Sequence, residues 1–198
     1  SYIDVETGIT FYGLGSPASP TGYSFGMLLP QSPTTDFIAQ IISPLTDGDG
    51  WGGVSLGSSM VGPLLLVTWA NGDKVMSTAR IANGHTPDAV VPYTANPIII
   101  LPIARGTFVN RTHVSSTFLC SGCINSDSFD PARADGWGSS NHSDVFFGYA
   151  FSQTAVDHPS DINTALSDHT GTGSGYGSFR VELSDIKSDE FEHYAAMA

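Results

Sequence analysis

The sequence predicts an all-β domain, and three features of its composition point that way. Its 198 residues include 22 glycines and 12 prolines, enough to punctuate many turns. Charged residues make up only 13%, about half of the roughly 25% usual in globular proteins, which leaves little material for long surface helices. Hydrophobic residues at 40% and aromatic residues at 11% suffice for a buried core. The length fits one domain better than two, so we expect residues 1–198 to form a single domain.

Nine short apolar or alternating segments, separated by turn residues, are expected to be strands. In chain order they are 23–29, 37–42, 51–56, 64–69, 74–81, 98–103, 113–120, 145–151 and 177–183. The dipeptide Asn71-Gly72 predicts a tight hairpin between the fourth and fifth of them. A short helix is expected over 184–196, which begins with carboxylates suited to a helix N-terminus. Short strands with frequent turns are typical of a sandwich or barrel.

The charge balance excludes two classes of partner. Asp and Glu number 19 against 7 Lys and Arg, giving a net charge of −12, whereas nucleic acids and anionic membranes select clustered basic residues. No apolar run approaches the roughly 18 residues of a spanning helix. Asn110 and Asn141 each begin an N-glycosylation sequon, and with the low lysine content they favour a secreted protein.

The two cysteines, Cys120 and Cys123, form a C-x-x-C pair with several possible meanings. A zinc site needs further ligands, and the chain has no other cysteine. A covalent haem site needs a histidine after the second cysteine, where Ile124 stands, and a thioredoxin-like site needs a βαβ setting. The remaining interpretation is a small local disulfide, whose turn Gly122 would help to close.

Other patterns carry less information on their own. The glycine-rich run 171–177 lacks the Lys-Ser/Thr ending of a phosphate-binding loop. The segment GSSMVG at 57–62 only loosely resembles a nucleophile elbow, and it does not have the G-x-S-x-G spacing. His169 directly precedes the glycine-rich run, where small residues would let a bulky planar ligand approach the backbone. Met60 lies in a Gly/Ser loop before an intensely apolar strand, but spacing alone does not join it to His169.

Two functions without redox chemistry compete at this stage. Trp51, Trp69 and Trp137 could form a sugar-stacking platform, as in a secreted carbohydrate-binding β-sandwich. Trp69 ends an apolar run and is expected in the core, which leaves loop-borne Trp137 as the better surface candidate. A small secreted hydrolase is the other alternative, because a catalytic triad needs only to meet in space.

Six blocks, taken together and in order, resemble one family. They are WGGVSLGSSM at 51–60, LLLVTWANG at 64–72, FLCSGC at 118–123, YAFS at 149–152, AVDHPSD at 155–161 and SDHT at 167–170. In this combination the chain resembles the N-terminal cytochrome domain of fungal secreted cellobiose dehydrogenases and the related quinone-dependent pyranose dehydrogenases. The resemblance spans most of the chain.

The resemblance implies an immunoglobulin-like antiparallel β-sandwich that holds one haem b, iron protoporphyrin IX, without covalent attachment. It implies that Met60 and His169 are the axial iron ligands. Ser58 and Ser59 stand where the family often has glycine and alanine before the methionine. Cys120 and Cys123 match the family's disulfide pair, and Asn110 falls where relatives carry a glycan.

One position departs from the family. Cellobiose dehydrogenases often have a tyrosine after the returning strand, which hydrogen-bonds a haem propionate, and His85 stands there by position. We expect an N–H of His85 to serve the propionate similarly.

The resemblance also implies a function in electron transfer, with no bond-making catalysis by this domain. The implied donor is an attached sugar dehydrogenase domain that carries flavin or pyrroloquinoline quinone, and the implied acceptor is a copper-dependent polysaccharide monooxygenase. We expect a secreted, extracellular, monomeric module that binds neither nucleic acid nor membrane.

Overall fold

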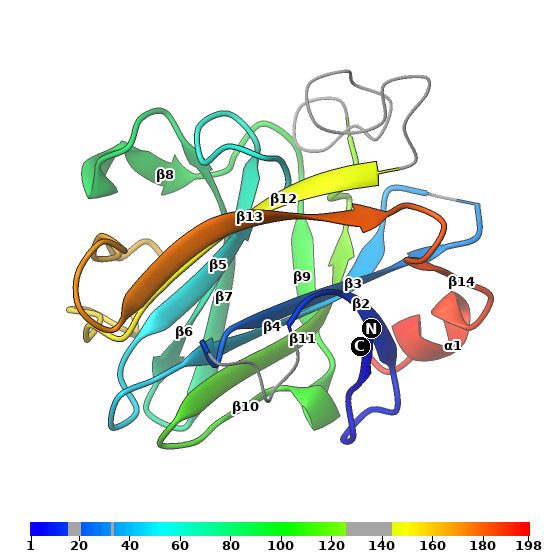
Figure 1. Cartoon of the computed structure of the whole chain (residues 1–198), viewed down its shortest axis with the longest axis horizontal. Helices are drawn as coiled ribbons and strands as arrows, with labels where there is room; N and C mark the ends of the chain where they lie inside the picture. The colour runs from blue at the N-terminus through cyan, green and yellow to red at the C-terminus, as the bar shows by residue number, and fades with distance from the viewer. Residues whose placement is uncertain (16–20, 33, 126–143) are drawn as a thin grey trace.

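The computed structural model describes residues 1–15, 21–32, 34–125 and 144–198, and it consists of two β-sheets packed face to face (Figure 1). The first sheet contains β1 (Tyr2–Ile3), β2 (Thr10–Leu14), β3 (Ser24–Pro30), β4 (Phe37–Pro44), β9 (Ile99–Pro102), β10 (Phe108–Val109), β11 (His113–Ser121) and β14 (Lys187–Ser188). The second contains β5 (Trp51–Ser55), β6 (Leu64–Asn71), β7 (Lys74–Ala82), β8 (Val90–Pro92), β12 (Asp144–Ser152) and β13 (Ser174–Glu182). The expected β-sandwich is thus confirmed.

Strand order brings distant parts of the sequence together. The first sheet runs β1-β2-β3-β4-β11-β10, with β14 beside β3 and β9 beside β11, and the second runs β13-β12-β5-β6-β7-β8. All pairs are antiparallel except β14 with β3. The second sheet therefore places β12 against β5, about a hundred positions earlier in the chain, with β13 on the other side of β12. This neighbourhood builds the site.

All nine expected strands exist, with ends shifted by a few residues. The hairpin between β6 and β7 turns at Gly72, whose φ of 63° is left-handed and suits glycine. The short strands β1, β2, β8, β10 and β14 were not expected, because two to five residues show no periodicity. β13 begins at Ser174, inside the glycine-rich run 171–177.

The expected short C-terminal helix is present, but it covers fewer residues than the range 184–196. Only α1 (Phe191–Ala195) is helical, while two short 3-10 turns lie elsewhere at Pro87–Ala89 and Ala104–Gly106. Before α1, Ile186 is fully buried in the core and its carbonyl accepts a hydrogen bond from the backbone N–H of Leu29 at 2.6 Å. Core burial and pairing with β3 therefore override the local preference for a helix.

The core between the sheets is aromatic. Phe25 of the first sheet and Phe147 of the second lie with ring centroids 5.3 Å apart, and Phe179 stacks on Phe147 at the same separation. A second cluster covers the outer face of the first sheet, where Tyr2 and Phe191 pack together. The two chain ends therefore lie close to each other, as Figure 1 shows.

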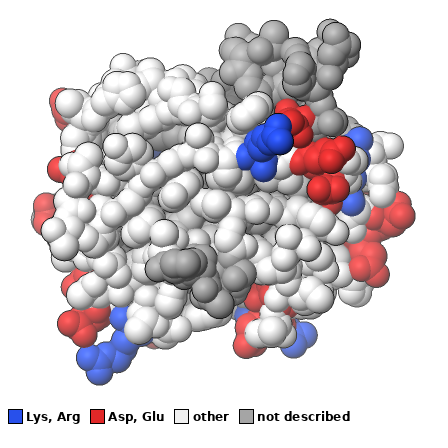
Figure 2. Space-filling model, in the orientation of Figure 1, with Lys and Arg blue, Asp and Glu red and all other residues white. Residues whose placement is uncertain are grey.

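Charged side chains are sparse on the surface drawn in Figure 2. Most lie along its edges, and one group of acidic and basic side chains lies on the face at the upper right. No helix in the described residues is long and apolar enough to cross a membrane.

Candidate functional site

A cavity of about 400 Å³ lies against the outer face of the second sheet. Its walls include three of the predicted site residues, Met60, His85 and His169, which come from three separate loops. Its volume lies within the range of roughly 300–1,000 Å³ typical of ligand and cofactor pockets. The sandwich thus brings together residues 109 positions apart (169 − 60) that spacing alone did not connect.

Small side chains on β12 and β5 form the middle of the cavity floor. Ser178, Gly148, Ser55 and Leu65 form one row across four neighbouring strands, and the next row includes Ala150 and Gly53. A Cβ added to Gly53 would approach the Cγ1 atom of Val67 to 2.8 Å, so the sheet is already tightly packed at this point. The result is a low, flat surface that suits a planar ligand.

Three long side chains fasten the segment 153–173, which carries His169, onto the sheet. The indole N–H of Trp51 in β5 donates to the hydroxyl of Ser167 at 3.0 Å, and that of Trp69 in β6 donates to the carbonyl of Pro159 at 2.8 Å. The guanidinium of Arg80 in β7 donates to the carbonyl of Ile162 at 3.1 Å. Three adjacent strands therefore each supply one N–H donor that fixes the segment.

Local contacts then orient His169 itself. Asp168 Oδ1 accepts hydrogen bonds from the backbone N–H and the hydroxyl of Thr170, at 3.0 and 2.8 Å, and these bonds hold the pKa of Asp168 below its usual value. The ring of Tyr176 lies 5.1 Å from the imidazole of His169, centroid to centroid. Tyr176 is itself 65% exposed, so the cavity reaches the surface beside His169.

Met60 lies in the loop between β5 and β6. The hydroxyl of Ser55 donates to the carbonyl of Ser59 at 2.5 Å, and Val61 forms an isolated bridge with Ala82 at the end of β7. The loop is therefore tied to the sheet on both sides of Met60, which fixes where the thioether can lie.

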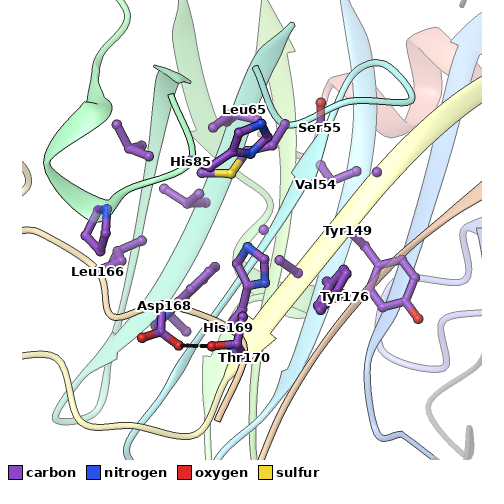
Figure 3. Close-up of a pocket in the computed structure, with 18 of the residues that line it drawn as sticks. Val54, Ser55, Leu65, His85, Tyr149, Leu166, Asp168, His169, Thr170 and Tyr176 are labelled. Atoms are coloured by element: carbon purple, nitrogen blue, oxygen red, sulfur yellow. Dashed lines mark hydrogen bonds between the residues drawn. The ribbon is translucent and has the colours of Figure 1, made fainter. Parts of the chain in front are cut away.

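His85 follows β7 in a short loop closed by a hydrogen bond from the backbone N–H of Asn83 to the carbonyl of Ala89, at 2.9 Å. Its side chain reaches the same cavity as His169, and Figure 3 shows the two imidazoles on opposite sides of the space. A role for His85 toward a bound group remains a prediction.

One polar atom in the cavity wall has no protein partner. The Nδ1 atom of His169 is buried and makes no hydrogen bond. Such an atom ordinarily finds a partner, and a bound group or water would supply it. A thioether and an imidazole on opposite loops are neutral donors of the kind that hold haem iron, so the residues present fit this group.

The described residues contain no cluster of three or more His, Cys, Asp or Glu side chains that could hold a metal ion by themselves. Cys120 and Cys123 form the expected disulfide, away from the cavity, in the core cluster between the sheets. Gly122, with φ of 75°, closes the turn between them, and its N–H donates to Asp36 at 2.9 Å.

Of the two sequon asparagines, only Asn110 lies within the described residues. Asn110 is exposed, and its Oδ1 atom accepts hydrogen bonds from the backbone N–H and hydroxyl of Thr112, at 2.9 and 3.0 Å. Asn141 lies outside the described residues, as does Trp137. Glycosylation of both asparagines stays a prediction.

A sugar-stacking platform of Trp51 and Trp69 is not supported. Their exposed fractions are 6% and 0%, and both pack beneath the 153–173 segment with Val67 and Leu166. The expectation that Trp69 is a core residue is confirmed. Sequence reasoning did not identify Arg80 or the role of Trp51 in holding Ser167, because both depend on where the segment folds back.

Comparison with known proteins agrees with the resemblance noted from the sequence. The family model described as the cytochrome domain of cellobiose dehydrogenase matches residues 2–193. The solved cytochrome domain of Myriococcum thermophilum cellobiose dehydrogenase is 26% identical, covers 100% of this chain and 94% of its own, and superposes with a TM-score of 0.79. The cytochrome b domain of pyranose dehydrogenase from Coprinopsis cinerea is 23% identical, with 99% and 93% covered and a TM-score of 0.78, a likeness of fold.

Proposed function

Because this chain belongs to the family of cytochrome domains of cellobiose dehydrogenase, we propose that it is a one-electron transfer module with haem b held between Met60 and His169. The observation that carries the proposal is that these two residues, on separate loops, line one cavity over a floor of small side chains. The unpartnered Nδ1 atom of His169 supports it further.

A bound haem supplies one-electron chemistry, its iron alternating between Fe(III) and Fe(II). The two axial side chains would occupy both remaining positions on the iron, which leaves none for oxygen or substrate. The thioether of Met60 is a soft, neutral donor, so it favours the reduced iron more than a second imidazole would. The module therefore relays electrons and does not itself make or break bonds.

The surrounding chain keeps the site rigid. Trp51 fixes Ser167, two residues before His169, and the bridge at Val61 fixes the residue after Met60. Two ligands that move little when the charge on the site changes make electron transfer fast. In this proposal His85, which lines the same cavity, donates an N–H to a haem propionate.

We propose residues 1–198 as one such domain of a secreted, extracellular enzyme, monomeric and bearing glycans at Asn110 and Asn141. The electron donor in this proposal is an attached sugar dehydrogenase domain with flavin or pyrroloquinoline quinone, and the acceptor is a copper-dependent polysaccharide monooxygenase. Membership of the family supports a linked dehydrogenase.

The ligand assignment is tested by Met60→Leu in haem-loaded protein. Loss of the thioether opens one position on the iron, so carbon monoxide should shift the Soret band of the reduced variant and leave that of the wild type unchanged. Met60→His should lower the equilibrium constant for reduction at least tenfold, about 59 mV for one electron.

The matched control is Met76→Leu, which removes a thioether that packs beneath the 153–173 segment, against Trp51 and Trp69. This variant should bind no carbon monoxide. A Met60→Leu protein with the wild-type spectrum and no response to carbon monoxide would refute Met60 as a ligand.

A further inference from the structure

Arg80 is a buried charge that makes no salt bridge in the described residues. Arg80 is only 2% exposed, and no other lysine or arginine in the described ranges is buried. Buried charges in proteins are ordinarily paired with an opposite charge or bound to a ligand. The burial of one of only seven basic residues therefore indicates a specific role for its charge.

The contacts of Arg80 do not neutralise it. One terminal nitrogen donates to the carbonyl of Ile162 at 3.1 Å, and the guanidinium carbon lies 5.6 Å from the ring centroid of Trp69. Its Nε atom is buried and has no hydrogen-bond partner. The ion pairs found in the described part of the chain involve other arginines, Arg111 and Arg180.

The guanidinium nevertheless stays charged. Burial lowers the pKa of Arg80, and the nearby carboxylate of Asp161 opposes this effect. An arginine remains protonated at any working pH even so, because the guanidinium group is the most basic of the ionisable side chains. The charge is thus permanent.

Arg80 lies beside the cavity, on the same outer face of the second sheet. It pairs across the strands with Leu65, which lines the cavity and in turn pairs with Ser55, another lining residue. On its other side it holds Ile162, in the segment that carries His169. It does not itself line the cavity, so no role as a ligand follows.

We propose that Arg80 is a fixed positive charge beside the haem cavity that raises the reduction potential of the bound haem. The inference rests on the proposed function. A bound haem gains one negative charge when its Fe(III) takes one electron to become Fe(II). A positive charge held nearby in a medium of low dielectric constant stabilises the reduced form, and screening by salt is weak for buried groups.

Arg80→Gln tests the inference, because glutamine keeps an N–H donor for the carbonyl of Ile162 and removes the charge. The equilibrium constant for reduction should fall about tenfold, which is about 59 mV for one electron. Arg80→Lys, measured at pH 5, where the ammonium is charged, should stay within about threefold of the wild type. Lys74→Gln is the matched control: it removes the same charge from an exposed position on the same strand, and the potential should again stay within about threefold.

A second measurement separates electrostatics from positioning. Cleavage of the 153–173 segment by a broad-specificity protease in haem-free protein should proceed at the same rate in Arg80→Gln as in the wild type. Faster cleavage together with a lower potential would assign Arg80 to holding the segment and overturn the inference. Failure of both Arg80→Gln and Arg80→Met to fold would have the same meaning.

The remaining outcomes are also decisive. An unchanged potential in Arg80→Gln, or an equal fall in Arg80→Lys, would overturn the inference. Either result leaves the proposed function intact, since that function fails only if the wild-type chain binds no haem.

Discussion

Hydrogen bonds from single side chains decide where the two proposed ligands lie. Ser55 holds the loop before Met60, and Trp51 holds Ser167 near His169. A typical hydrogen bond contributes about 0.5–1.5 kcal/mol net, so each is small beside the whole stability of a domain. Their importance lies in geometry, because both act within two residues of a ligand.

His85 allows a prediction at the same scale. If its N–H serves a haem propionate, His85→Phe removes a donor to an anionic group, and the reduction potential and its dependence on pH should both change. The measurement is a redox titration of the haem-loaded protein at several pH values.

The control is His193→Phe. His193 is an exposed residue of α1, which packs against the first sheet, away from the cavity. This variant should titrate as the wild type does. If His85→Phe left the potential and its pH dependence unchanged, the propionate role would be refuted.

At the scale of elements, β13 explains the glycine-rich run. A Cβ at Gly175 would meet the ring of Phe151 at 2.7 Å, and one at Gly177 would meet the ring of Tyr149 at 2.8 Å. Tyr149 is in turn stacked on Tyr23, with centroids 5.1 Å apart, so its ring has little room to move. Glycine at these two positions therefore serves the packing of β12 against β13, and Gly177 also lines the cavity.

Gly177→Ala should consequently destabilise the fold by about 1–3 kcal/mol, the usual cost of overpacking. Gly171→Ala, in the same run, places its Cβ in open space and should change stability by less than about 0.5 kcal/mol. Urea unfolding of the two variants measures the difference. Equal stabilities would contradict the packing explanation.

The long strands were predictable, and the short ones were not. β4, β6, β11 and β12 have eight or nine residues and strong apolar patterns, so the sequence alone located them. β14 consists of two residues, and its existence depends on pairing with β3 across the whole chain. The same dependence on tertiary contacts explains why only α1, and not the whole expected range 184–196, is helical.

The candidate site was predictable only through the family resemblance. Residue patterns by themselves left Met60 and His169 unconnected, because the sandwich that joins their loops is a long-range arrangement. Arg80 gave no signal, since a basic residue in an alternating strand ordinarily faces water. It is buried because the 153–173 segment folds over it, as its bond to Ile162 shows.

At the scale of the whole molecule, the net charge of −12 is the property most open to test. Charges of this size steer diffusional encounters, and salt screens that steering. Electron transfer to a positively charged one-electron acceptor should therefore slow as ionic strength rises. Stopped-flow rates from low to high salt measure the effect, and rates independent of salt would count against steering by the acidic surface.

The reduced-minus-oxidised absorption spectrum of the purified chain tests the central claim most directly. A haem held by Met60 and His169 predicts a red protein whose Soret band sharpens and shifts on reduction. A colourless protein, even when haem is supplied during expression, would contradict the assignment of this chain as an electron-transfer module.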